Sequence, residues 1–421
     1  MADYQYIDTE KQLTSFYKEN KNVEWIGFDT EFVGENRYNT LLCLIQVATS
    51  NGNYLLDPLK LKTLDPLFKL IKDPKILVIT HAGQNDYRIL YQVYKVVPKN
   101  IFDTQLAAGY LGYRYPVSFQ KLLRGELGVS ISKTYTVTNW EKRPLGKKQI
   151  NYALNDIIHL KELYESLLKK LKTKKYWEWA QSEMARYTQP TYFKKNKHHE
   201  ALNSKLMKNL NQHQQVFLLR LYEWRDQEAS LKNRTKEQIL PKRLMGTIVR
   251  NIAAGKDALK DNRTIPNKSL LKNWSIFNNL FQKKNTKAER DLLLDLPVDI
   301  ELSEEMGLTN EMLFILVKQK CQESGIAQSL VLQKNEISKA QMGERRLDFL
   351  DNWRKEFLGD DFVNLLTAPG KMKMKLSGRK VSVTFTEKPI MDEKNPKTAK
   401  SIKVTEKPQK PQKPDRAPKK K

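Results

Sequence analysis

Cysteine is scarce in this sequence, and long apolar runs are missing. The only two cysteines, Cys43 and Cys321, lie far apart, which excludes a disulfide-stapled scaffold and a CxxC-type zinc site and suits a reducing cytoplasm. No apolar run approaches the roughly 18 residues of a membrane span. The first residues show no basic region followed by an apolar stretch, so no secretory signal is expected. We therefore expect a cytoplasmic protein without a membrane partner.

Acidic residues are outnumbered by basic ones. The chain has 421 residues, with 74 Lys and Arg against 48 Asp and Glu, and a formal net charge of +26. Such an excess indicates a polyanionic partner, above all nucleic acid. Residues 371–421 alone hold 17 Lys and Arg and 5 Asp and Glu. The net charge therefore predicts the class of partner but does not indicate which reaction, if any, the protein carries out on it.

Residues 371–421 form a basic tail. From Pro389 on, the tail has too few apolar residues to offset its chain entropy, and we expect it to be disordered. The alternation at Val381–Thr386 is compatible with a strand, but we expect a fraying segment there. A cationic tail either binds phosphate backbones without reading sequence or simply keeps the chain in solution, and the sequence leaves both open.

Residues 1–185 are predicted to form an α/β domain. Helical spacing is found at Thr63–Lys72, Asp86–Val97 and, over a long segment, Lys147–Lys172. Three antiparallel strands followed by alternating strand and helix predict a mixed sheet with helices on its faces. The expected strands are Val23–Phe28, Leu41–Ala48, Tyr54–Leu56, Ile76–Thr80 and Ile101–Phe102.

Almost all of the remaining pattern is helical. It predicts one all-α bundle over residues 205–280 and a second over 287–370, joined by a polar segment near 280–287. Together with the α/β domain and the tail, this gives four parts.

Carboxylates stand at the ends of the predicted strands. Asp29 and Glu31 follow the first strand, and two residues apart on a strand they point to one face. Asp86 follows the strand Ile76–Thr80, and Asp156 lies four residues after Tyr152, on one face of a helix. Four acids gathered in one place repel one another unless a cation lies between them. Oxygen ligands of this type suit Mg²⁺ or Mn²⁺ and disfavour zinc.

Each acidic pattern also has an ordinary explanation. A lone DxE is common by chance, Asp86 alone is compatible with a helix N-cap, and a YxxxD pair usually belongs to a solvated helix face. Their order and placement together favour a site for two divalent ions roughly 3.5–4 Å apart, as used for in-line attack on a phosphodiester. In such a site one ion lowers the pKa of the attacking water, the other stabilises the leaving 3′ oxygen, and a tyrosine hydroxyl orients the water.

Six motifs then resemble, in order, the ribonuclease D family of 3′→5′ exonucleases, over about residues 20–175. The family belongs to the group named for its Asp-Glu-Asp-Asp ligands, in the branch with a tyrosine in the last motif. The motifs are DTEF (Asp29–Phe32), LIQVAT (Leu44–Thr49), THAGQND (Thr80–Asp86), FDTQLAAGYLG (Phe102–Gly112), TNWEKRPL (Thr138–Leu145) and YALND (Tyr152–Asp156).

The resemblance implies a ribonuclease H-like fold and a set of roles. It assigns metal binding to Asp29, Glu31, Asp86 and Asp156, and orientation of the water to Tyr152. Asp103 is not a ligand in the family pattern, and we interpret it as a capping or orienting acid beside the site. Asn139 stands where the family usually has an acid before Trp140, which affects a local contact and leaves the catalytic set intact.

The helical part resembles the helicase-and-ribonuclease-D C-terminal (HRDC) domain, of which the family usually carries two. The resemblance is clearer over Gln212–Gly255 than over Leu347–Leu366, and it implies contact with the nucleic-acid substrate. A solvated basic face is the plainer explanation of the same pattern. The candidate contact residues are Arg220, Arg225, Lys236, Lys242 and Arg243.

We therefore predict a metal-dependent hydrolase, a 3′→5′ exoribonuclease that releases 5′-mononucleotides. The resemblance implies RNA as partner, with tRNA precursors or other structured RNA as substrate. Two divalent cations, no organic cofactor and a monomer are expected. One alternative is a DNA exonuclease of the same group, which the absence of a GxxxxGK[ST] motif disfavours. The other is an RNA-binding scaffold with a decayed site, which the complete set of acids and tyrosine disfavours.

Overall fold

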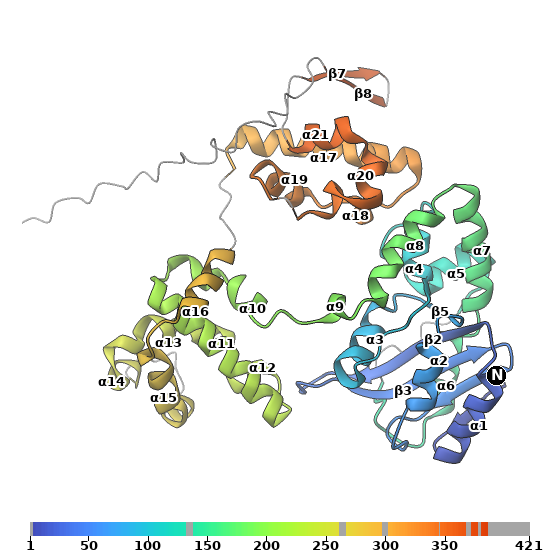
Figure 1. Ribbon diagram of the computed structural model, residues 1–421, viewed down its shortest axis with the longest axis horizontal. Coiled ribbons are helices and arrows are strands. Elements are labelled where there is room, and N and C mark those ends of the chain that lie inside the picture. The colour runs from blue at the N-terminus through green and yellow to red at the C-terminus, as the bar shows by residue number, and fades with distance from the viewer. Residues whose placement is uncertain are drawn as a thin grey trace, which may run out of the picture.

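A six-stranded mixed sheet forms the centre of the N-terminal domain in the computed structural model (Figure 1). The structure describes residues 3–131, 138–260, 267–296, 302–344, 346–367, 372–377 and 380–385. The order of the strands across the sheet is β1-β4-β3-β2-β5-β6. Their bounds are β1 Gln5–Ile7, β2 Trp25–Val33, β3 Leu41–Thr49, β4 Gly52–Leu56, β5 Leu77–Thr80 and β6 Ile101–Asp103.

The predicted strand directions are confirmed. Strands β2, β3 and β4 are antiparallel neighbours, and β5 and β6 run parallel to β2. Strand β1, which the sequence pattern did not reveal, pairs in parallel with β4 at one edge. Strand β2 is longer than predicted, since it continues through Asp29 and Glu31 to Val33. Both acids therefore lie within the sheet, and the site is built on a rigid element.

Helices cover both faces of this sheet. On β2, Ile26 and Phe28 belong to the larger core, whereas Gly27 faces a smaller core beneath α6 and the start of α7. The helices are α1 Glu10–Asn20, α2 Asp65–Ile71, α3 Gln84–Ile89, α4 Thr104–Gly109, α5 Phe119–Leu127, α6 Lys147–Asn155, α7 Leu160–Thr173 and α8 Trp177–Ala185.

The long helix expected at Lys147–Lys172 is broken in two. Helix α6 ends at Asn155, and α7 begins at Leu160 after a turn. The turn approaches β2 at Gly27, where an added Cβ would lie 3.3 Å from Leu160 Cδ1 and 3.4 Å from the carbonyl oxygen of Ile157. The break thus brings the chain corner that carries Asp156 onto the strand that carries Asp29 and Glu31.

The first helical bundle has its own core, which lies mainly between α11, α13 and α15. We predicted that residues 287–296 open the second bundle, but they pack on the first, where Leu292, Leu293 and Leu296 contact its core. The helices from the end of the α/β domain to this point are α9 Pro190–Phe193, α10 His199–Leu202, α11 Gln212–Lys232, α12 Lys236–Ile239, α13 Lys242–Asn251, α14 Lys256–Lys260, α15 Asn267–Gln282 and α16 Lys287–Leu292.

The second bundle shares a core with the α/β domain. Trp353 stacks on Trp179 of α8 with ring centroids 5.8 Å apart, and its indole donates a hydrogen bond to Glu183 at 3.0 Å. Arg354 forms a largely buried ion pair with the same Glu183 at 2.7 Å. The helices of the second bundle are α17 Glu304–Ser324, α18 Gln328–Val331, α19 Lys334–Gln341, α20 Asn352–Leu358 and α21 Asp360–Thr367.

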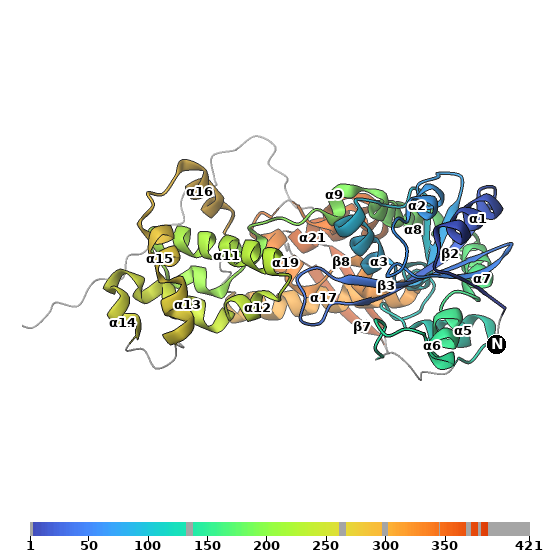
Figure 2. The ribbon, with the colours of Figure 1, turned by 90° about the horizontal axis from the view of Figure 1, so that it is seen from below.

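The first bundle contacts the α/β domain through the loop between β2 and β3. The Tyr38 hydroxyl donates to Asp226 of α11 at 2.9 Å, and the Asn39 backbone donates to the Asn233 side chain at 3.0 Å. Figure 1 and Figure 2 both show the tip of this hairpin reaching α12. The hairpin therefore joins the strand that carries two of the site acids directly to the first bundle.

The start of the basic tail differs from the prediction. Strands β7 Met372–Ser377 and β8 Lys380–Phe385 form an antiparallel pair, where a fraying segment was expected. The rest of the tail, residues 386–421, lies outside the described residues, as do 132–137. Among the described helices, none has the length and apolar character needed to cross a membrane.

Candidate active site

Two carboxylates of the site stand on β2, on the face that α6 covers. Asp29 and Glu31 alternate with Thr30, which points to the opposite face. Asp29 lies opposite Gln46 of β3, and Glu31 lies opposite Leu44, just before a bulge in the pairing. Because the pairing fixes both residues, the two carboxylates project from one face of a rigid strand.

The third carboxylate comes from the corner after α6. Asp156 caps the C-terminal end of α6 in helical backbone conformation, and Tyr152 lies one turn earlier. The Tyr152 hydroxyl hydrogen-bonds the Asp156 carboxylate. Oxygen atoms of Asp29, Glu31 and Asp156 all lie within 4.8 Å of one another. Residues 127 positions apart in sequence thus form one group of partly buried carboxylates.

Asp86 completes the set from the other side of β2. It is buried, with 6 % of its surface exposed, and it lies in the first turn of α3 after the N-cap Gly83, so it is not itself the N-cap. Its carboxylate accepts a hydrogen bond from the hydroxyl of Thr30. Among the neighbouring charges, that of Asp86 acts most strongly on Asp29. The strand residue between the two β2 acids therefore ties Asp86 to them.

Asp103 fixes the backbone from which Asp86 projects. It is the N-cap of α4, and it also accepts hydrogen bonds from the backbone of Ala82 at 3.1 Å and of Gly83 at 2.9 Å. An added Cβ on Gly83 would lie 2.5 Å from Thr80 Oγ1, so only glycine fits this approach to β5. The start of α3 is therefore held by a buried acid on one side and by close packing on the other.

A ring contact and a buried ion pair support Tyr152. Its ring lies 6.1 Å from that of Trp140, which is buried. The backbone carbonyl of Trp140 accepts a hydrogen bond from Arg143, whose guanidinium pairs with the buried Asp57 at 2.6 Å. Asn139 accepts a hydrogen bond from the Glu141 backbone through its side-chain oxygen at 3.0 Å. An amide oxygen can thus serve this local contact in place of the acid usual in the family.

Burial raises the pKa of every acid in the cluster, and repulsion from neighbouring acids adds to it. Burial first, and then the charge of Asp86, raises the pKa of Asp29 well above its usual range. Burial, followed by the charges of Asp156 and Asp86, raises the pKa of Glu31 to about 9. Burial raises the pKa of Asp86 and that of Asp156 to about 7, although hydrogen bonds from Thr30 and Tyr152 act against it. Four acids in this state favour a cation among them.

The residues fit hard divalent cations. Carboxylate oxygens are the ligands that Mg²⁺ and Mn²⁺ prefer, and no cysteine or histidine joins the close group among the described residues. Gln46, opposite Asp29, is fully buried, and neither atom of its amide has a hydrogen-bond partner among the described residues. A buried orphan amide beside four clustered acids indicates that this place is complete only with a bound polar group.

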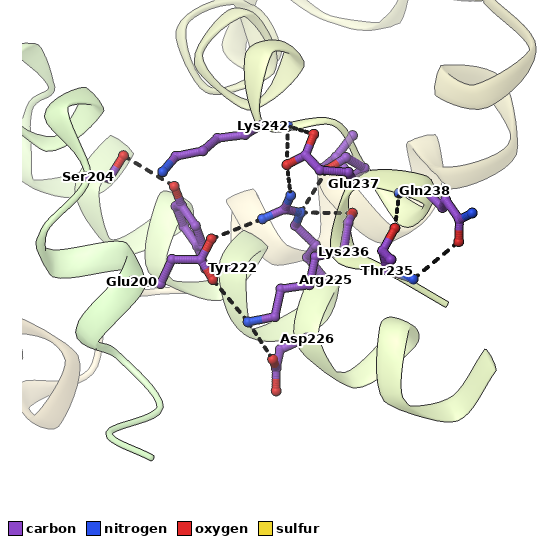
Figure 3. A network of polar contacts seen from close by, with 11 residues as sticks. Glu200, Ser204, Tyr222, Arg225, Asp226, Thr235, Lys236, Glu237, Gln238 and Lys242 are labelled. Atoms are coloured by element: carbon purple, nitrogen blue, oxygen red, sulfur yellow. Dashed lines mark hydrogen bonds and ion pairs between the residues drawn. The ribbon is translucent and has the colours of Figure 1, made fainter. Parts of the chain in front are cut away.

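Two of the predicted nucleic-acid contacts have a structural role instead. Arg220 is 7 % exposed, pairs with Glu289 at 2.7 Å and donates to backbone carbonyls of 280–284. Arg225 is 1 % exposed and donates to the carbonyl of Leu240 at 2.7 Å. It also forms ion pairs with Glu200 and Glu237 (Figure 3). Their charges are used inside the first bundle, which corrects the prediction for both residues.

The other three predicted contacts lie at the starts of helices α12 and α13 of the first bundle. Lys236 forms ion pairs with Glu200 at 2.9 Å and Asp226 at 2.7 Å, which occupy its charge (Figure 3). Lys242 and Arg243 are exposed at the start of α13. Of the five, only these last two stay candidates for contact with a polyanion.

Thr30 and Gln46 are site residues that sequence reasoning missed. The available signal was polar character inside strongly apolar strands, since Gln46 interrupts the run LLCLIQVAT and Thr30 separates two acids. A polar residue at a buried strand position requires a partner. Thr30 has this partner in Asp86, whereas the amide of Gln46 has none among the described residues.

Comparison with known proteins identifies the family of this chain. A family model described as 3′-5′ exonuclease matches residues 4–172, which include all of the site residues on the α/β domain. The ribonuclease D of Desulfotalea psychrophila is 30 % identical over 377 residues, covering 86 % of this chain and 98 % of the relative. The ribonuclease D of Bartonella henselae is 29 % identical over 372 residues, covering 86 % and 89 %.

The fold extends the likeness to the helical part. The crystal structure of Escherichia coli RNase D, described as an exoribonuclease involved in structured RNA processing, superimposes with a TM-score of 0.74 at 21 % identity. The match covers 87 % of this chain and 100 % of that one, so it includes the mixed ribonuclease H-like sheet and both bundles. The chain therefore belongs to the ribonuclease D family of 3′→5′ exoribonucleases.

Proposed function

We propose that this chain removes nucleotides one at a time from the 3′ ends of structured RNA, such as tRNA precursors, by metal-dependent hydrolysis. The observation that carries the proposal is the cluster itself. Three carboxylates lie within 4.8 Å of one another, and Asp86 stands beside Asp29. Burial and repulsion make it costly in free energy to hold these charged acids together without a cation. Such a cluster, on a domain that matches 3′-5′ exonucleases, supports phosphodiester hydrolysis.

The proposed ligands are the four acids of the cluster. Asp29, Glu31 and Asp156 would hold one divalent cation, and Asp86 would hold a second one together with Asp29. We propose Mg²⁺ or Mn²⁺, because all of the donors are hard oxygens. When bound, the two ions supply Lewis-acid activation of water and stabilisation of the leaving 3′ oxygen.

The side chains of the protein position the reactants. The Tyr152 hydroxyl, held by Asp156 and by its contact with Trp140, would hydrogen-bond the attacking water and aim it at the terminal phosphorus. Burial raises the pKa of Tyr152, so the phenol keeps its proton throughout the physiological pH range. It would therefore orient the water as a neutral hydroxyl.

We further propose roles for the helical bundles and the tail. Both bundles would act as HRDC domains that contact RNA, and the basic residues beyond Pro389 would add affinity for phosphates. Deletion of 389–421 should reduce the dependence of RNA affinity on salt, and an unchanged slope would show that the tail does not contact phosphate.

We also propose that the protein is a monomer and that it is cytoplasmic. The cytoplasmic location is in keeping with the two cysteines, which are buried and unpaired. Light scattering tests the oligomeric state.

Degradation of end-labelled RNA tests the function. RNA labelled at the 5′ end should shorten to a ladder, and RNA labelled at the 3′ end should release its label as a mononucleotide first. A chelator should stop both, and added Mg²⁺ or Mn²⁺ should restore them. A DNA of the same sequence should be cut more slowly. Chelator-resistant activity, or release that begins at the 5′ end, would contradict the proposal, and faster cleavage of DNA would favour a DNA exonuclease.

A further inference from the structure

A cavity of about 480 Å³ opens on the first bundle, between the end of α11, α12 and α15. Its volume is within the range of small-ligand sites in proteins. No acidic residue is found among its described lining residues, which are Trp224, Lys232, Arg234, Gln238, Ile239, Lys272 and Asn273. The cavity therefore combines an aromatic ring with three cationic side chains.

The aromatic wall of the cavity is held in place. Trp224 is half-buried, and its indole packs edge-on against Phe277 of the bundle core, with centroids 5.0 Å apart and planes at 87°. Phe277 is almost fully buried, so this contact fixes the indole from within. An indole that is anchored on one side and lines a cavity on the other presents a fixed surface for stacking.

The cations differ in how much of their charge is available. Lys232 forms an ion pair with Glu228 on the same helix. Arg234 and Lys272 are exposed, and neither forms an ion pair with a described residue. Two cations without an ion-pair partner among the described residues, beside an indole, are a combination that suits an unpaired nucleotide, since the base stacks and the cations pair with phosphate.

The cavity lies next to the hairpin that leads to the catalytic strand. Gln238, which lines it, donates a hydrogen bond to Asn36 at 3.3 Å, and Asn233, between two lining residues, accepts one from Asn39. Asn36 lies five positions after Glu31, a distance of at most about 17 Å along extended chain. The cavity is therefore within reach of a strand of RNA whose 3′ end is at the carboxylates.

We propose that this cavity binds one unpaired nucleotide of the substrate RNA upstream of the cleaved 3′ end, with the base on Trp224 and the phosphate on Arg234 and Lys272. The proposal rests on the proposed exoribonuclease function and deepens it. The cavity would then be the place where the first bundle contacts RNA, instead of Arg220 and Arg225, which are buried. It also predicts a dependence on RNA length, because a short substrate ends before it reaches the cavity.

The test compares charge-reversal and ring variants on long and short RNA. Lys272→Glu and Trp224→Ala should raise KM for a long single-stranded RNA about fivefold or more and leave kcat unchanged. For a dinucleotide, both constants should stay at the wild-type values. Lys283→Glu is the matched control, since it makes the same charge change on an exposed lysine about 16 Å further along, just after α15, and it should behave as the wild type. Trp224→Phe keeps a stacking ring and a packed core, and it should lose less than Trp224→Ala.

Binding measured in the inactive Asp29→Asn background separates the two proposals. Lower affinity of Lys272→Glu for long RNA, with unchanged affinity of Lys283→Glu, supports the cavity whether or not the enzyme cuts. Equal affinities of both variants and the wild type for long RNA would overturn the cavity and leave the exoribonuclease function standing. Equal losses in Lys272→Glu and Lys283→Glu would also overturn it, since only bundle charge would then matter. If Trp224→Ala unfolds, the Trp224→Phe and Lys272→Glu results decide.

Discussion

The hydroxyl of Thr30 donates a hydrogen bond to the carboxylate of Asp86, and this bond joins strand β2 to helix α3. Thr30 faces away from the two acids that flank it, and from this opposite face of β2 it holds Asp86. The bond also opposes the effect of burial on the Asp86 carboxyl, because a donor to the charged form lowers its pKa.

Thr30→Val should shift the pH dependence of the reaction. Removal of the hydroxyl removes a contribution that lowers the pKa of Asp86, so this pKa should rise from its value of about 7. The acid must be ionised to bind a cation, and the acidic limb of the rate profile should therefore move upward by about one pH unit. Rates measured against pH at fixed metal concentration check this, with Thr30→Ser as the control that keeps the bond. An unmoved limb in Thr30→Val would show that the bond does not govern Asp86.

Asp29→Asn should abolish nuclease activity and leave the fold and RNA affinity largely intact. Asp29 belongs to the close group of three carboxylates and also faces Asp86, so its loss affects every proposed ligand pair. Loss of several kcal/mol of transition-state stabilisation lowers the rate by about 10³-fold or more. Single-turnover cleavage and an RNA-binding assay, run on one preparation, separate catalysis from binding. A fully active variant would overturn the assignment of the site.

Tyr152→Phe should have a smaller effect, confined to the catalytic rate. The phenylalanine keeps the ring contact with Trp140 and loses only the hydroxyl that hydrogen-bonds Asp156. We expect kcat to fall by about 10²-fold with little change in KM, the order of magnitude of a positioned hydroxyl in proton-transfer steps. Unchanged turnover would argue against its role in orienting water.

Asp103→Asn should weaken both the fold and the site. Oδ1 of Asp103 accepts from Ala82, Gln105 and Leu106, whereas Oδ2 accepts from Gly83 alone. An asparagine can keep the first set but turns its amide nitrogen toward the Gly83 N–H, which is left without an acceptor. The free energy of unfolding should fall by about 1–3 kcal/mol, as urea titration would show. Because Gly83 begins the helix of Asp86, the cleavage rate should fall as well, and an unchanged rate would show that this helix start is held by packing alone.

The sequence predicted the α/β domain well because its signals are local. Apolar, β-branched runs correspond to β2, β5 and β6, and an acid comes at the end of each run or, as Asp86 does, shortly after it. These acids meet because neighbouring parallel strands end at one edge. Helix α1 was not predicted although it has a capping box between Thr9 and Gln12, since few of its residues are buried. Strand β1 has three residues at the edge of the sheet, and a segment that short depends on its partner β4 for its structure.

The basic residues of the first bundle were misjudged for a different reason. Helix α11 has buried residues on most sides, so its sequence does not indicate which charged side chains point outward. Arg220 is neutralised by Glu289, 69 positions later, and no local pattern reveals such a partner. The cavity beside Trp224 is likewise formed by α15, whose placement depends on the packing of the whole bundle. The type and spacing of charged residues could be used directly from the sequence, whereas the burial of Arg220, which depends on segments far away in the chain, could not be predicted from it.

Gln46→Leu should separate stability from activity. The amide of Gln46 is fully buried opposite Asp29 without a partner among the described residues, which costs about 1–3 kcal/mol relative to a paired amide. If that amide finds its partner only when the site is loaded, leucine should leave the metal-free protein as stable as the wild type or more so. The same variant should need a higher metal concentration for half-maximal cleavage. Tyr54→Phe is the matched control, because the Tyr54 hydroxyl is also buried without a partner among these residues but belongs to the core on the other face of the sheet. It should change stability only. A wild-type metal requirement in Gln46→Leu, or a loss of metal-free stability beyond about 1 kcal/mol, would show that the amide serves the fold and not the site.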